Sequence, residues 1–439
     1  MNRIYFDYAA TTPMDPLVKK AMAPYFSDRF GNPGSLHSFG QEAMAMVDES
    51  REKIAKAVNA DFREIIFTGS ATEANNLALR GIVRAARLFS DGTGRSLAPA
   101  ASAALDLSAA RLPSVDQARA ASETFRTKTA EPPYRIIISK IEHDSILETA
   151  RDLERDGIEV IYLPVNKNGL IDLEKLKKSL NERTILVSIM HANNEIGTIQ
   201  PIAEIAKIIK QFKNNKEKFF STYPLFHTDA VQAFQFLNCD VNKLGVDLMT
   251  LSAHKIYGPK GIGCLYVKSQ NSKFNPPAGG LNPIITGGGQ EFGLRSGTEN
   301  VPAIAGFAKA IELVSNSREL ENKRVKQLAD YFWEEIKKIE PKAEINGMLN
   351  ANKLPNILNI CFPGQNAQDL LIKLDLNGVA VSSGSACSAR ATKPSHVLKA
   401  IGLSDKKIKS SLRFSLGKFM TKNELNRALK IINRILKKV

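Results

Sequence analysis

Short apolar runs alternate with amphipathic stretches between residues 64 and 267. The runs have the length and the β-branched or aromatic content of strands, and stretches such as 145–155 and 202–212 repeat apolar residues with a helical period. The predicted strands are residues 64–67, 135–139, 158–162, 184–189, 225–228, 248–251 and 263–267. Such alternation is typical of a doubly wound sheet, which binds ligands at the carboxyl ends of its strands. We therefore predict an α/β fold built on a mostly parallel, seven-stranded sheet.

The pattern changes beyond residue 270. A loop rich in Pro, Gly and Asn at 275–289 leads into a long helix over 302–339, and shorter strands and helices follow, as in an α+β unit. We place the boundary near residue 268. The predicted large domain is 15–267, and the smaller α+β domain combines 1–14 with 268–439.

Residues 88–133 do not fit this alternation, because Ala, Ser, Thr and charged residues dominate them. They separate two segments that should be neighbours in the sheet. We expect a solvent-exposed insertion without a catalytic role, with a short helix around 114–125.

Length, composition and charge narrow the function classes. The 439 residues are 43% apolar and 24% charged, as in ordinary globular proteins, and suffice for two domains. No apolar run reaches membrane-helix length and the N-terminus does not resemble a signal peptide, so we expect a cytoplasmic protein and no membrane partner. Much of the net charge of +15 lies on helical faces such as 175–178 and 430–438, so nucleic acid is not expected as a direct partner.

The four cysteines are far apart and form no CxxC pair, so neither a zinc site nor a disulfide framework is predicted. Cys264 and Cys361 have apolar neighbours that indicate core positions. Cys387 instead lies in a small, polar stretch, VSSGSACSA (381–389), which we expect to be mobile. A reactive thiol is therefore predicted at Cys387.

Lys255 and Asp229 each follow a predicted strand. Lys255 ends the sequence SAHK (252–255), where it could form a Schiff base in a cleft, although most lysines are simply solvated. Asp229 could pair with a protonated pyridine nitrogen or could merely cap a helix. The order of the two residues suits successive strands of one sheet.

The segment TGSATE (68–73) lies where a strand turns into a helix. Small and hydroxyl residues at a helix N-terminus expose N–H groups to a phosphate. Ser70 and Glu73 also have the spacing of a capping box, so a simple cap remains an alternative.

Together these segments resemble the cysteine desulfurases of the NifS/IscS type, within the class V aminotransferase group of fold-type I pyridoxal-phosphate enzymes. The resemblance runs from Ile4 to the region of Lys430, apart from the insertion. It rests on an ordered series of motifs: DYAATTP (7–13), FGNP (30–33), EH (142–143), HANNEIG (191–197), HKIYGPKG (254–261), RSGT (295–298) and SSGSAC (382–387).

The resemblance implies pyridoxal 5′-phosphate as cofactor and assigns the site residues. Lys255 would form the Schiff base and move the Cα proton, His143 would stack on the ring and exchange protons, and Cys387 would accept the sulfur. Arg413 and Asn194 would bind the substrate, since a guanidinium grips a carboxylate through two hydrogen bonds. The implied cofactor contacts are Ala71, Thr72, His143, Asn194, Asp229, Gln232, Ser252, His254, Lys255 and Thr298.

The implied reaction converts L-cysteine to L-alanine and leaves a persulfide on Cys387. The sulfur would pass to an acceptor protein, such as an iron–sulfur scaffold or a thiolation enzyme. Thr298 would reach the phosphate from a second subunit, which makes the expected homodimer necessary for the site.

One position departs from the resemblance, and two alternatives remain open. Phe292 stands where relatives usually carry a basic residue. A selenocysteine lyase or another class V enzyme, such as a small aminotransferase, would use the same cofactor but would not depend on Cys387. A catalytically idle relative would be colourless when purified.

Overall fold

A seven-stranded sheet forms the centre of the computed structural model, which describes residues 3–90, 134–214, 223–269, 281–348, 352–384 and 394–437. Its strands are β2 (Ile65–Thr68), β3 (Arg135–Ser139), β4 (Glu159–Leu163), β5 (Thr184–Ser188), β6 (Leu225–Asp229), β7 (Leu248–Ser252) and β8 (Gly263–Val267). They are ordered β2-β8-β7-β6-β5-β3-β4; β8 runs antiparallel to β2 and β7, and every other neighbouring pair is parallel. The predicted fold class is confirmed, and each predicted strand lies within one residue of an observed one.

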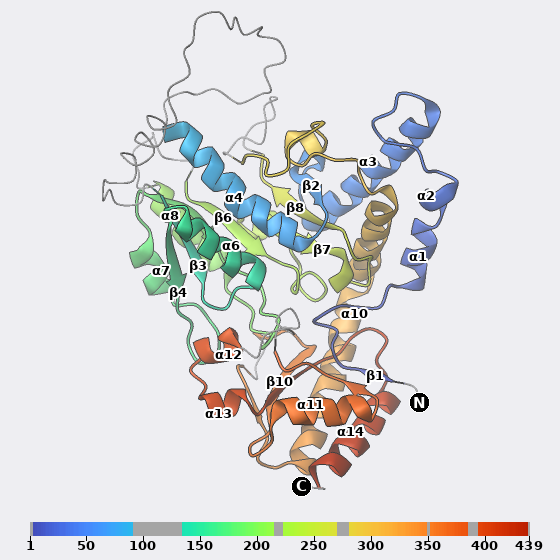
Figure 1. Ribbon diagram of the computed structural model, residues 1–439, viewed down its shortest axis with the longest axis vertical. Coiled ribbons are helices and arrows are strands. Elements are labelled where there is room, and N and C mark those ends of the chain that lie inside the picture. The colour runs from blue at the N-terminus through green and yellow to red at the C-terminus, as the bar shows by residue number, and fades with distance from the viewer. Residues whose placement is uncertain are drawn as a thin grey trace, which may run out of the picture.

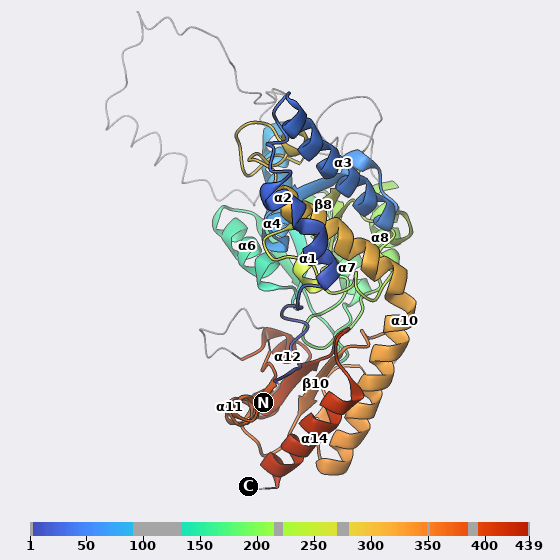
Figure 2. The same ribbon diagram turned by 90° about the vertical axis from the view of Figure 1, so that its right-hand side faces the viewer.

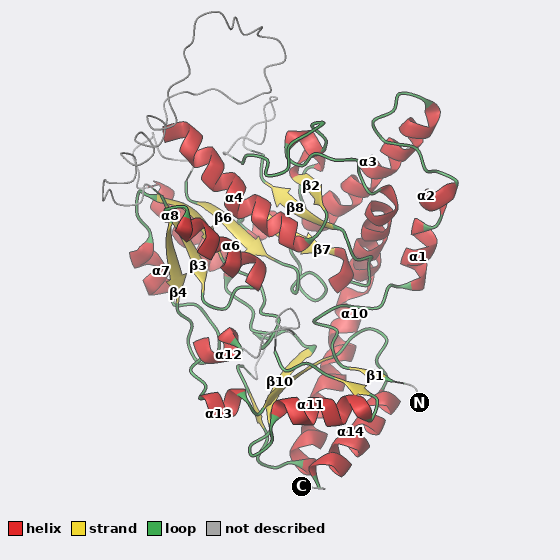
Figure 3. Cartoon of the chain, in the orientation of Figure 1, coloured by secondary structure: helices red, strands yellow, loops and turns green. Residues whose placement is uncertain are grey.

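Helices cover both faces of this sheet (Figure 3). Because side chains alternate along a strand, Ile136 and Ile138 of β3 pack with the helices of one face, while Ile137 packs with those of the other. The first face carries α4 (Ala71–Ser90) and α6 (Asp144–Arg155). The second carries α3 (Ser38–Val58), α8 (Ile202–Asn214) and α10 (Val301–Ile339).

A second group of elements lies below the sheet in Figure 1. Strands β9 (Glu344–Ile345), β10 (Ile357–Cys361) and β12 (Ser411–Ser415) form an antiparallel sheet, and β1 (Ile4–Tyr5) pairs with β11 (Val379–Ala380). Helices α11 (Ala367–Leu376) and α14 (Lys422–Leu436) pack on this group. Its composition matches the α+β unit predicted for the smaller domain.

Helix α10 runs along both groups of elements (Figure 2). Its first turns pack on α3 and on α1 (Pro16–Met22), while Phe332 near its end contacts Phe414 of β12, with ring centroids 5.2 Å apart. Because α10 packs on both groups of elements, the structure does not mark a boundary at residue 268, and the division into domains there stays a prediction.

The remaining helices are short: α2 (Pro24–Ser27), α7 (Leu173–Ser179), α9 (Val241–Leu244), α12 (His396–Ala400) and α13 (Asp405–Ile408), with 3-10 turns η1 (Phe62–Glu64), η3 (Ala253–Lys255) and η4 (Glu291–Gly293). No helix in the described ranges is long and apolar enough to cross a membrane. Helix α4 continues to Ser90, and the rest of the predicted insertion, including the expected helix at 114–125, lies outside the described residues.

Candidate active site

Asp229 and Lys255 lie at the same edge of the sheet. Asp229 ends β6, and β7, the next strand in space, ends at Ser252 and leads directly into the turn η3 that carries Lys255. Asp229 Oδ1 accepts a hydrogen bond from the backbone N–H of Val231 at 3.0 Å, and Oδ2 accepts one from Asn75 Nδ2 at 2.8 Å. The Asp229 side chain therefore caps the following turn, which was the alternative interpretation from the sequence. It is also bound by Asn75 of α4.

Asn75 links this carboxylate to His143. Buried in α4, it donates from Nδ2 to Ser145 Oγ at 2.8 Å, and that hydroxyl lies 2.9 Å from His143 Nδ1. The backbone N–H of Ser145 also donates to His143 Nδ1 at 3.1 Å, because His143 is the N-cap of α6. Nδ1 is thus an acceptor, and in the neutral ring the proton resides on Nε2.

The N-terminal motif 7–13 packs against the lysine turn. Lys255 Nζ donates to the carbonyls of Ala9 and Ala10 at 2.7 and 2.6 Å, and Gln232 Nε2 donates to Ala9 at 2.9 Å. His254 Nδ1 lies 3.2 Å from Thr11 Oγ1. Burial, reinforced by the charge of Lys255, lowers the pKa of His254 to about 4, so this imidazole is neutral at pH 7.

The start of α4 forms a polar corner beside β8. Ala71 is its first residue, and Gly263 of β8 approaches so closely that an added Cβ would lie 2.9 Å from the Ala71 nitrogen. Thr72, in the first turn, is exposed. The cap interpretation also holds, since Glu73 N–H donates to Ser70 Oγ at 3.1 Å and Gly69 N–H donates to the Glu73 carboxylate at 2.9 Å.

Arg413 is fully buried, with 1% of its surface exposed. It donates to the backbone carbonyl of Asn194 at 2.9 Å and to Asp7 Oδ1 at 2.7 Å. The structure thus brings together the two residues predicted to bind the substrate. Since Asp7 already neutralises the guanidinium, a substrate carboxylate can reach Arg413 only if these contacts change.

Two predicted site residues are not brought into this group. Thr298 is exposed, three residues after Arg295, which pairs with Glu73 at 2.8 Å. Cys387 lies outside the described residues.

The other three cysteines are buried, which confirms the core positions predicted for Cys264 and Cys361. Burial raises the pKa of the Cys239 thiol to about 12 and also raises the pKa values of Cys264 and Cys361. A thiol that resists ionisation is a poor nucleophile.

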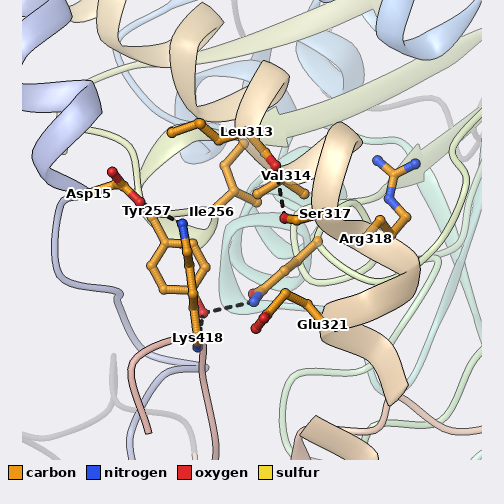
Figure 4. Close-up of a pocket in the computed structure, with 10 residues that line it drawn as sticks. Asp15, Ile256, Tyr257, Leu313, Val314, Ser317, Arg318, Glu321 and Lys418 are labelled. Carbon is orange, nitrogen blue, oxygen red and sulfur yellow. Dashed lines mark hydrogen bonds and ion pairs between the residues drawn. The ribbon is translucent and has the colours of Figure 1, made fainter. Parts of the chain in front are cut away.

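A small cavity lies behind the lysine turn, between α10 and the chain that follows β12 (Figure 4). Its volume is about 10 Å³, room for about one water molecule. Lys418 and Asp15 close it with an ion pair of 2.7 Å. The cavity is too small for a cofactor or an amino acid, so the polar groups at the strand ends, and not this cavity, mark the candidate site.

The groups at the strand ends fit pyridoxal 5′-phosphate. The Ser252 hydroxyl is buried, has no hydrogen-bond partner among the described residues, and can donate to a phosphate oxygen. The Asp229 carboxylate keeps lone pairs for a protonated pyridine nitrogen, and Lys255 lies in the turn that follows the neighbouring strand β7, at the same sheet edge.

Comparisons with known proteins agree with this arrangement. The family model "Aminotransferase class-V" matches residues 4–93 and 116–428. The chain is 42% identical to "Cysteine desulfurase IscS" of Dictyoglomus turgidum, across 100% of this chain and 95% of that protein. A solved "NIFS-LIKE PROTEIN" superposes with a TM-score of 0.80 at 34% identity, covering 100% of both chains. The structure titled "SspA in complex with cysteine" gives a TM-score of 0.72 at 33% identity, covering 95% of this chain and 100% of that one. The chain therefore belongs to the class V aminotransferase family, among its cysteine desulfurases of the NifS/IscS type.

Proposed function

We propose that this protein removes sulfur from L-cysteine, releases L-alanine and holds the sulfur as a persulfide on Cys387. The observation that carries the proposal is the convergence of Lys255, Asp229 and His143, with Asn75 and Ser145 connecting the last two. The full-length likeness to proteins named cysteine desulfurase supports the choice of reaction within the family, as does a relative solved with cysteine.

Enzymes of this family depend on pyridoxal 5′-phosphate, which when bound supplies an electron sink for charge that develops on an amino-acid Cα. Asp229 would hold the ring nitrogen, His143 would stack on the ring, and Gln232 with Asn194 would contact its oxygen side. The phosphate contacts proposed on the family pattern are Thr72, Ser252, His254 and, from a second subunit, Thr298, and Ala71 is a further proposed cofactor contact.

Lys255 would move the proton at the substrate Cα. Its amine already lies between two backbone carbonyls that hold it at the sheet edge without neutralising it. Arg413 would grip the substrate carboxylate once its pairing with Asp7 is loosened, and Asn194 would contact the substrate from the same side. His143 can donate a proton from Nε2, because Nδ1 is occupied as an acceptor.

Cys387 would take the sulfur as its thiolate. An S–S bond forms to the substrate sulfur while the C–S bond breaks, and the electron pair of the broken bond stays on the carbon that a proton then converts into alanine. The burial of Cys239, Cys264 and Cys361 supports this assignment, since none of them can present a thiolate to the site. The sequence also places Cys387 three residues after Gly384, which lies near Glu195, the residue that follows Asn194.

A homodimer is proposed as the working unit. Exposed apolar side chains between α1 and α3 support a subunit interface there: Phe26 and Phe30 are each 67% exposed, and Leu36 is 93% exposed. The sulfur acceptor is proposed to be an iron–sulfur scaffold or a thiolation enzyme, and the cytoplasmic location expected from the sequence stays a prediction.

Alanine and sulfide formation from L-cysteine, with a thiol reductant present, tests the proposal. The wild-type protein should carry the cofactor and make both products in equal amounts, and Lys255→Ala should lose at least about 100-fold in rate because the proton-transfer group is gone. A cofactor-loaded wild-type protein that makes no alanine from cysteine would instead point to another class V reaction.

A further inference from the structure

Two buried acidic residues stand next to candidate site residues in the chain. Glu142 directly precedes His143, and Glu195 directly follows Asn194; neither acidic residue has any exposed surface. Both lie in loops at the carboxyl ends of the sheet strands. A residue that binds Glu142 or Glu195 is therefore held close to the candidate site.

Ser395 binds Glu195 from the other half of the chain. Its hydroxyl donates to Glu195 Oε2 at 2.5 Å and accepts from the backbone N–H of Leu398 at 3.1 Å, so one hydroxyl both caps α12 and ties it to Glu195. Glu195 Oε1 has no hydrogen-bond partner among the described residues and is buried. A buried carboxylate is costly unless it accepts hydrogen bonds, so the Ser395 hydroxyl is an important partner of Glu195.

His396 makes a second contact of the same kind. Its Nε2 lies 2.9 Å from the backbone carbonyl of Glu142, which can only accept, so Nε2 carries the proton. The apolar side chains that follow it in α12, Val397 and Leu398, pack in one buried cluster with Ile141 of the loop before His143. Helix α12 is thus docked by polar and apolar contacts on the loops that present His143 and Asn194.

Gly384, which precedes residues 385–393, lies near the same Glu195 carboxylate that Ser395 binds from the other side of this segment. A Cβ built on Gly384 would lie 3.5 Å from Glu195 Oε2 and 3.7 Å from the Cβ of Ser395. Two residues earlier, Ser382 exchanges two backbone hydrogen bonds with Arg413, at 3.2 and 2.6 Å. The described chain on both sides of residues 385–393 therefore converges on Glu195.

We propose that Glu195 and Ser395 are positioning residues for the sulfur-transfer step: their hydrogen bond ties the flank that follows the Cys387 segment to the loop that carries Asn194, and Glu195 lies beside Gly384 on the flank that precedes it. This proposal rests on the proposed function, because the step it concerns is the attack of Cys387 on the sulfur of bound cysteine. Neither residue contacts the reacting atoms in the proposed reaction.

A pair of serine variants separates positioning from helix capping. Ser404 caps the neighbouring helix α13 through Lys407 N–H, at 3.4 Å, and its hydroxyl makes no hydrogen bond to a site loop in the described part of the chain, so Ser404→Ala is the matched control for Ser395→Ala. In the cofactor-loaded protein, Ser395→Ala should form persulfide on Cys387 at least about tenfold more slowly in a single turnover, as expected for losing a hydrogen bond to a charged group. Cofactor content and the KM for cysteine should stay at wild-type values in both variants, and Ser404→Ala should match the wild-type rate.

Two conservative variants supply the rescue. Ser395→Thr keeps the hydroxyl and Glu195→Gln keeps an acceptor oxygen, so both should transfer sulfur faster than Ser395→Ala and Glu195→Ala, respectively. Mass spectrometry of the alkylated protein gives the persulfide fraction. The inference is overturned if Ser395→Ala and Glu195→Ala transfer sulfur within about twofold of wild type, or if Ser404→Ala slows equally. A wild-type protein that forms no persulfide would overturn the proposed function itself, which is a different result.

Discussion

Glu142 is a fully buried carboxyl group one residue from His143. Its Oε1 accepts from Ser139 Oγ at 2.5 Å and from the Met190 N–H at 2.9 Å, while Oε2 has no partner in the described part of the chain. Burial raises the pKa of Glu142 to about 8 and outweighs these donors, so the folded protein holds this carboxyl protonated at pH 7.

This raised pKa predicts the sign of a pH effect on stability. The folded carboxyl keeps its proton up to about pH 8, whereas the unfolded one releases it near 4.5, so the free energy of unfolding falls as the pH rises across this window. Glu142→Gln removes the titration, and the stability of the wild type relative to this variant should fall by up to about 1.4 kcal/mol per pH unit. Urea unfolding of both proteins at several pH values from 5 to 8 measures the difference; a difference independent of pH would show that Glu142 is ionised when folded.

For single residues, the sequence predicts the candidate reactive side chains better than the side chains that position them. Lys255 and Asp229 could be predicted because each follows a recognisable strand within a motif. Asn75 could not, because its role depends on α4 crossing the end of β6, and no local signal separates it from its neighbour Asn76. The contact of buried Arg413 with Asp7 also depends on the tertiary structure and has no local sequence signal, since the two residues lie 406 positions apart.

Three elements distant in sequence meet at a buried ion pair. Arg51 of α3 makes two hydrogen bonds, at 2.7 and 2.8 Å, with Glu291 of η4, and Glu291 accepts from the Phe67 N–H of β2 at 2.8 Å. Phe292, the departure noted in the sequence, has a φ of 57°, and its ring centroid lies 4.9 Å from the Arg51 guanidinium carbon. The pair therefore fixes the turn that precedes Thr298, and Phe292 covers it with a cation–π contact.

Removing one partner of this ion pair should be far more harmful than changing both. Arg51→Met leaves the Glu291 charge buried without its partner and should lower the free energy of unfolding by about 3–5 kcal/mol. The double variant with Glu291→Gln should be more stable than Arg51→Met alone, because the unpaired charge is gone while the acceptor for Phe67 remains. Denaturant unfolding of the single and double variants gives the coupling; losses that simply add would mean that the pair is not coupled.

Element predictions succeeded where the pattern is local and failed where pairing is long-range. Strand periodicity placed the large sheet to within one residue, and the helix predicted over 302–339 appears as Val301–Ile339. The two-residue pair of β1 and β11 has no such signal, since Ile4 pairs with Val379. The predicted insertion has no structural test outside α4.

In the proposed homodimer, a residue of the second subunit completes the candidate site. Thr298 is exposed in the single chain, although the family pattern assigns it to the phosphate. Exposed apolar residues such as Phe30 and Leu36 give the chain a surface that a second copy could cover. If Thr298 acts across the interface, a subunit with natural Thr298 can restore activity to the site of a partner that carries a Thr298 variant.

Mixed dimers test this exchange. Thr298→Asp places a negative charge against the phosphate and Lys255→Ala removes the amine, so each variant alone should be inactive. In co-expressed subunits about half of the dimers are mixed, and each has one site with both natural residues, so about a quarter of wild-type activity should return. Alanine formation by the purified mixture measures it. Absence of any recovery would show that Thr298 serves its own chain or none.

The role of Cys387 is tested most directly by following the sulfur itself. Wild type, Cys387→Ser and the thiol control Cys361→Ala are given L-cysteine, and alanine and protein-bound persulfide are measured together. The proposed function predicts equal amounts of both products in the wild type and the control, and neither in Cys387→Ser, although that variant should still bind the cofactor. Alanine formation by Cys387→Ser at the wild-type rate would rule out the proposed role of Cys387, because another group would then accept the sulfur.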